Sequence, residues 1–157
     1  MIDAQFAAYE ARCTKAAALT AEILPHNKQV LFDALSAAGI DVVTVEFDGS
    51  GDSGQFEAPA GFDAENTEVA IPAGEITVKV VDFETGTIRE QTTTPREYIE
   101  TLAYDFLEST HSGWEDGEGA KTNGGKNGEF RFSLSERTIT LDYNERYVAY
   151  THHEHEF

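Results

Sequence analysis

At residues 39–48 the chain reads GIDVVTVEFD, and here its hydrophobic pattern changes from helical to extended. Before Gly39 the apolar residues recur about every 3.6 positions, which is typical of a helix packed on one side. From Asp41 onward they alternate, so that Val43, Val45 and Phe47 face one side, as in a half-buried strand. Gly39 suits the left-handed position that ends many helices. We therefore predict a helix up to about residue 38 and a strand directly after it.

Upstream of this point we expect two helices. Asp3 can cap the first, and Pro25 is expected to end it at about residue 24. Asn27 can cap the second, which runs to Gly39. The first helix carries an apolar stripe of Phe6, Tyr9, Cys13, Ala17 and Leu24. Because alanine fills much of the remainder, residues 1–26 are expected to form a peripheral N-terminal helix.

Downstream we expect antiparallel strands and one further helix. A return strand over 55–58, a hairpin over 76–92 and a helix capped by Thr94 follow the first strand. A long polar loop spans 111–128. Three short strands then end the chain: they are centred on Phe130–Leu134, Ile139–Tyr143 and Tyr147–Ala149, with turns at Ser135–Arg137 and Asn144–Arg146. The predicted fold is a single α+β domain over residues 1–157, with two N-terminal helices, five to seven strands and a helix inserted between hairpins.

The composition narrows the classes of protein to which this chain can belong. The chain has 157 residues, 40% of them hydrophobic, and no run of about 20 apolar residues that would cross a membrane. The N-terminus lacks the apolar core of a signal peptide, and the single cysteine, Cys13, favours a cytoplasmic location. Eleven basic against 29 acidic residues give a net charge of −18. Such a charge argues against direct binding of nucleic acid or an anionic membrane.

The negative charge is concentrated in the middle of the chain. Residues 1–40 carry 3 basic and 4 acidic side chains, residues 41–94 carry 2 and 12, and residues 95–157 carry 6 and 13. We expect the carboxylates of the central segment to gather on one exposed surface and to attract a protein partner with a basic surface.

Three motifs resemble a known family. They are EFDGSGDSGQ at residues 46–55, HSGWE at residues 111–115 and DYNERY at residues 142–147. The resemblance is to an uncharacterised bacterial family of unknown function, found in proteobacterial genomes, plasmids and prophages, and it covers roughly residues 27–157. It implies an accessory gene carried on mobile elements and brings no catalytic activity or cofactor with it.

The Gly-rich loop after the first strand has two further interpretations. Asp48, Ser50, Asp52 and Glu57 offer alternating oxygen ligands of the kind that Ca²⁺ prefers, although the spacing departs from an EF-hand. The alternative is a plain turn between two strands. The string Gly51-Asp-Ser-Gly54 matches the nucleophile motif of trypsin-like proteases, but the flanking sequence does not, so a hydrolytic site built on Ser53 and His111 is not favoured.

The best candidate for a partner-binding surface is the loop around Trp114. Tryptophan is enriched at binding hot spots, and here it lies among acids. The expected contact residues are Trp114, Glu115, Asp116 and Glu118, together with Glu65 and Glu68 of the acidic middle segment. A lone Trp after a helix is equally expected to close the edge of the core.

Three functions follow, in order of preference. The first is a small, acidic, non-enzymatic protein that binds a protein partner and, in its most specific form, imitates nucleic acid to inhibit a host defence nuclease or a CRISPR-type effector. The second is a Ca²⁺-binding module that uses the 48–57 loop. The third is an enzyme of unrecognised type using Asp52, Ser53, His111 and Glu115. The sequence defines no cofactor, and it leaves the oligomeric state and the identity of the partner open.

Overall fold

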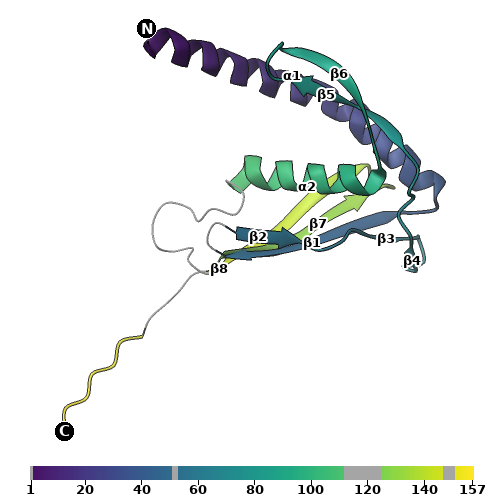
Figure 1. Ribbon diagram of the computed structural model, residues 1–157. Helices are drawn as coiled ribbons and strands as arrows, with labels where there is room; N and C mark the ends of the chain where they lie inside the picture. Colours follow the sequence, from purple (N-terminus) through teal and green to yellow (C-terminus); the bar gives the residue numbers. More distant parts are fainter. Residues whose placement is uncertain (1, 51–52, 112–124, 147–150) are drawn as a thin grey trace.

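The computed structural model describes residues 2–50, 53–111, 125–146 and 151–157 (Figure 1). Two helices and eight strands make up this part of the chain, which confirms the expected α+β class. In chain order they are α1 (Ile2–Ala37), β1 (Val42–Ser50), β2 (Ser53–Phe56), β3 (Ala60–Phe62), β4 (Glu68–Val69), β5 (Ile76–Asp82), β6 (Thr87–Thr93), α2 (Pro95–His111), β7 (Gly125–Ser133) and β8 (Thr138–Arg146). Helix α2 therefore does lie between two hairpins, as predicted.

The main sheet has six antiparallel strands with β1 near its centre. Its order is β4-β3-β1-β7-β8, and β2 also pairs with β1, on the edge that β3 occupies further along. Strand β7 pairs with β1 from Val42↔Ser133 to Gly49↔Lys126 and with β8 along its whole length. Strands β5 and β6 form a separate two-stranded sheet that lies against α1 (Figure 1). The predicted hairpin thus does not join the main sheet.

The core lies between one face of the main sheet, α2 and the C-terminal half of α1. The alternation predicted for the first strand is confirmed, since Val43, Val45 and Phe47 are all buried. Helix α2 contributes Ile99, and β7 contributes Phe130. Because one face of β1, β7 and β8 is packed in this way, every second residue of these strands points to the opposite, outer face.

The prediction of two N-terminal helices separated at Pro25 is wrong: α1 is one helix of 36 residues that contains this proline. The missing N–H of Pro25 removes one helical hydrogen bond, but Ile23 and Leu31 are buried on either side of it and hold both segments in place. Figure 1 shows the axis of α1 bending along its length, for which an internal proline is the usual cause.

Asn27 does not act as a helix cap. Its side chain is 3% exposed and bonds to the backbone of β5: its amide donates to the carbonyl of Lys79 at 2.8 Å, and its oxygen accepts from the N–H of Lys79 at 2.7 Å. The side chain thereby replaces the partner strand that the outer edge of β5 lacks. This pair of bonds fastens the β5–β6 hairpin to α1.

The turn predicted at Asn144–Arg146 is also wrong, because these residues belong to β8. Strand β7 starts at Gly125, within the predicted loop, and its backbone pairs with β8 as far as Arg146. The turn at Ser135–Arg137 is confirmed, and Arg137 adopts the positive φ of 58° that closes it. The third C-terminal strand, predicted around Tyr147–Ala149, lies outside the described residues.

In the described part of the chain, no helix has the length and apolar character needed to cross a membrane.

Candidate functional site

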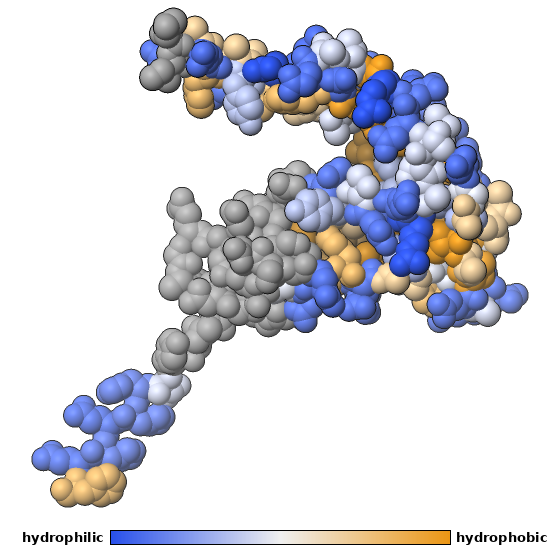
Figure 2. Space-filling model, viewed as in Figure 1, coloured by the Kyte–Doolittle hydropathy of each residue, from blue (hydrophilic) through white to orange (hydrophobic). Residues whose placement is uncertain are grey.

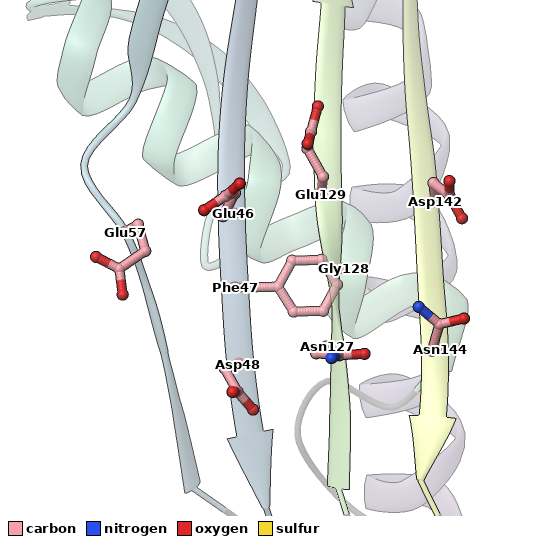
Figure 3. A pocket seen from close by; sticks show the side chains of 9 residues that line it. All are labelled: Glu46, Phe47, Asp48, Glu57, Asn127, Gly128, Glu129, Asp142 and Asn144. Atoms are coloured by element: carbon pink, nitrogen blue, oxygen red, sulfur yellow. The ribbon is translucent and has the colours of Figure 1, made fainter.

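The outer face of the main sheet carries a row of carboxylates that crosses neighbouring strands. Glu46 on β1 lies directly opposite Glu129 on β7, and Glu129 lies directly opposite Asp142 on β8. On the other side of β1, the N–H of Glu57 donates to the carbonyl of Glu46 at 2.8 Å, so Glu57 extends the row. We call Glu57, Glu46, Glu129 and Asp142 the carboxylate row. Figure 3 shows the four side chains across the sheet.

Polar residues flank this row on both sides. Asp48, Asn127 and Asn144 form the next row of directly opposed residues, and Thr44, Arg131 and Thr140 form the row on the other side. The carboxylate row, Asp48 and the two asparagines surround a shallow hollow of about 440 Å³ (Figure 3). We call these seven residues the acidic face. Five carboxylates thus share this surface, and Arg131 lies in the row next to the carboxylate row.

The arrangement brings like charges together. Directly opposed side chains on antiparallel strands are about 5 Å apart at Cβ, and like charges at that distance destabilise the sheet. The ion pairs formed among the described residues are Arg12–Glu84, Arg96–Glu100 and Arg137–Asp33, so none of them neutralises the carboxylate row. Folding therefore places a concentrated negative potential on this face.

Asn127 adds an unused hydrogen-bond acceptor beneath the carboxylates. Its Oδ1 atom is buried and accepts no hydrogen bond. Buried polar atoms in folded proteins almost always have a partner, so this oxygen would gain from a donor, which could reach it from the hollow once neighbouring side chains move aside. A lysine ammonium or an arginine guanidinium would supply both that donor and a positive charge.

The predicted calcium ligands are only partly brought together. Asp48 and Glu57 both lie on the acidic face, Asp48 opposite Gln55 and Glu57 just beyond the end of β2. Asp52 and the side chain of Ser50 lie outside the described residues. Among the residues that are described, no group of three or more His, Cys, Asp or Glu side chains is placed to hold a metal ion. The calcium site stays a prediction.

The predicted partner-binding residues lie in two places. Trp114, Glu115, Asp116 and Glu118 fall within 112–124, outside the described residues. Glu65 and Glu68 are exposed: Glu65 is in the turn between β3 and β4, where its N–H donates to Asp63 Oδ1 at 2.9 Å, and Glu68 lies opposite Phe62 on the edge strand. Neither belongs to the acidic face. Of the candidate catalytic pair, Ser53 is the first residue of β2 and His111 is the last residue of α2. The structure describes only the backbone of these two residues.

Sequence reasoning missed Glu46, Glu129 and Asp142, although each carries a readable signal. Glu46 lies between Val45 and Phe47, Glu129 precedes Phe130, and Asp142 lies between Leu141 and Tyr143. Alternation alone therefore places all three on the polar side of their strands. What it does not provide is the register, which sets these carboxylates opposite one another.

The geometry does not show to which family the chain belongs, but a comparison with family models does. The fold is an α+β domain with one helix-covered and one exposed sheet face, and residues 23–157 match the family of unknown function DUF6878. The chain belongs to this family, which confirms the resemblance to an uncharacterised family. Comparisons with curated proteins and with solved structures gave no match.

Proposed function

We propose that this protein binds a protein partner through the acidic face, and that the contacted surface of the partner is basic. The observation that carries the proposal is the carboxylate row, in which four acids from separate segments are set side by side and have no ion pair among the described residues. Lysine and arginine side chains of a partner would relieve the repulsion between these acids through charge-assisted hydrogen bonds.

The partner's basic surface is, in the finer form of the proposal, one that normally holds nucleic acid. Neighbouring strands are about 4.8 Å apart, so the row presents a line of regularly spaced negative charges, as one strand of DNA does with one phosphate per roughly 3.4 Å of helix axis. A net charge of −18 adds long-range attraction to such a groove. The protein would then act as a non-enzymatic inhibitor that occupies the groove of a nuclease, with a CRISPR-type effector as one candidate.

A capture experiment with matched variants tests the proposal. The acidic-face variant carries Glu46→Gln, Glu129→Gln and Asp142→Asn. The control variant carries Glu22→Gln, Glu75→Gln and Glu136→Gln, which removes the same charge from exposed positions elsewhere. Each protein is immobilised and exposed to a lysate of the source cell at about 50 mM and 500 mM NaCl, where the screening length falls from roughly 14 Å to 4 Å.

We expect the wild type and the control variant to capture the same basic nucleic-acid-binding protein at low salt, and the acidic-face variant to lose most of it. High salt should weaken the capture for all three. Equal capture by the acidic-face variant and the wild type would refute the proposal. A partner that is captured through the acidic face but binds no nucleic acid would retain the binding function and refute the imitation of nucleic acid.

A further inference from the structure

The N-terminal part of α1 projects away from the rest of the molecule. We call residues 2–22 the arm; they precede the segment that matches the family model, which begins at residue 23. Figures 1 and 2 show the arm extending beyond the sheet and α2, supported by the tip of the β5–β6 hairpin. That support consists of a Tyr9–Phe83 ring contact at 6.0 Å and of Arg12, which lies over the ring of Phe83 and pairs with Glu84 at 3.9 Å.

One side of the arm is apolar and largely exposed, and it continues into Leu24, which packs against the core. Phe6, Cys13, Ala17 and Leu24 lie on the same side of the helix, because Phe6 and Leu24 are 18 residues, or five full turns, apart. Phe6 is 61% exposed, although a phenylalanine of a stable helix usually packs against a neighbour. The arm therefore presents an apolar stripe that is largely exposed to solvent.

The same stripe continues into an apolar groove. Ala17 and Leu24 form one wall of a hollow of about 600 Å³ between α1, β5 and α2. The other walls include Val80, Leu102 and Phe106. Figure 2 shows the hollow between the arm and the body of the molecule. One molecule thus carries both an exposed aromatic knob, Phe6, and an apolar groove of suitable size.

We propose that the protein forms a two-fold symmetric dimer in which the arm of each copy lies antiparallel to the arm of the other and enters its groove. A two-fold axis near residue 15 pairs residues whose numbers add up to 30. Phe6 of the second copy then lies against Leu24 at the mouth of the groove, and Cys13 of the second copy lies beside Ala17. The same contact is made twice, as closed two-fold interfaces require.

Charge supports a second copy as the occupant. The dimer needs two chains of net charge −18 to approach, and residues 1–40, with 3 basic and 4 acidic side chains, are the least acidic part of the chain. In the antiparallel arrangement Asp3 of the second copy lies opposite Asn27, one residue from Lys28, so the charges at the two ends of the stripe are complementary. Pairing through the sheet would instead bring two acidic faces together.

The contact area is sufficient for a dimer. From Phe6 to Leu24 the stripe is about 27 Å long, and a helix is about 10 Å wide. Two such strips, together with both Phe6 rings inside the grooves, bury on the order of 1,000 Å², which reaches the lower limit of specific interfaces. The acidic faces remain exposed in this dimer, so the proposed function does not depend on it.

Sedimentation velocity of the full chain between about 1 and 100 µM tests the proposal. We expect a dimer whose dissociation constant rises about 100-fold or more in Phe6→Glu, because both buried rings are lost at once. The control is Ala18→Glu, an equal change of charge at an exposed position about 120° around the same helix from Phe6, which should leave the dimer intact. A wild-type monomer at 100 µM, an unchanged dimer in Phe6→Glu, or equal loss in Ala18→Glu would overturn the inference.

Cysteine cross-linking tests the antiparallel register separately. Ala17→Cys should form a covalent dimer with the native Cys13 of the second copy under mild oxidation, whereas Ala18→Cys should not. Equal cross-linking by both variants would contradict the arrangement. Salt separates the dimer from the proposed function: raising NaCl should strengthen the dimer by screening the two negative chains, whereas capture of a basic partner should weaken.

Discussion

Glu129→Gln is predicted to make the protein more stable. Glu129 is the centre of the carboxylate row, with Glu46 directly opposite on one side and Asp142 on the other. Favourable cross-strand pairs each contribute about 0.2–1 kcal/mol, and directly opposed like charges destabilise the sheet. Taking a cost of the same size for each of the two pairs, their removal should raise the free energy of unfolding by about 1 kcal/mol. For a chain of this size that corresponds to a rise of roughly 3 °C in Tm.

Urea denaturation followed by circular dichroism measures this change at low ionic strength. Glutamine keeps the size and polarity of the side chain, so the effect reports on charge. Glu75→Gln, an exposed position just before β5, is the control and should change stability by less than about 0.5 kcal/mol. In about 1 M NaCl the gain for Glu129→Gln should shrink, because the screening length falls to about 3 Å.

A loss of stability in Glu129→Gln, or a gain that persists unchanged in 1 M NaCl, would refute the electrostatic reasoning. The same substitution should weaken capture of the basic partner. An exposed row of like charges that lowers stability and raises affinity is the trade-off expected of a binding surface, because natural proteins give up stability at functional sites.

Three further predictions concern the support of the fold. Asn27→Leu removes both bonds to Lys79 and leaves its backbone N–H and C=O without these partners, so the free energy of unfolding should fall by about 2–4 kcal/mol in urea denaturation; an unchanged value would show that the hairpin is held by packing alone. Gly128→Ala places a Cβ against the backbone of Asp142 and Tyr143, which forces β7 and β8 apart, so a lower Tm and weaker partner capture are expected together; an unchanged Tm would contradict that close packing. Burial raises the pKa of Tyr98 to about 12 from the ordinary 10.0. Its contribution to stability is therefore complete below pH 10 and is lost as the pH rises toward 12. Over this range the free energy of unfolding should decline less in Tyr98→Phe than in the wild type, and identical declines would contradict the prediction.

The strands and helix ends with strong local patterns could be predicted from the sequence. Val43, Val45 and Phe47 are buried as their alternation indicated, and Gly39, with φ 83°, closes α1. Thr94 also caps α2, since its Oγ1 accepts from the N–H of Glu97 at 3.3 Å. These features depend on neighbouring residues alone, which is why local patterns reveal them.

The features that depend on distant partners could not be predicted. Pro25 stays inside a helix because buried residues on both sides hold it there, and Asn27 bonds to Lys79, 52 residues away. The length of β8 follows from its pairing with β7, which overrides the turn signal at Asn144. The carboxylate row depends on register in the same way, because Glu46, Glu129 and Asp142 come together only through pairing across three strands.

The most direct test of the acidic face is the association rate of the captured partner, measured by stopped-flow mixing as NaCl rises from about 50 to 500 mM. For the wild type and for the control variant at Glu22, Glu75 and Glu136, we expect the rate constant to fall at least tenfold, with a much smaller change in dissociation. For the acidic-face variant it should start lower and fall less. Equal rates and equal salt dependence for all three proteins would contradict the account.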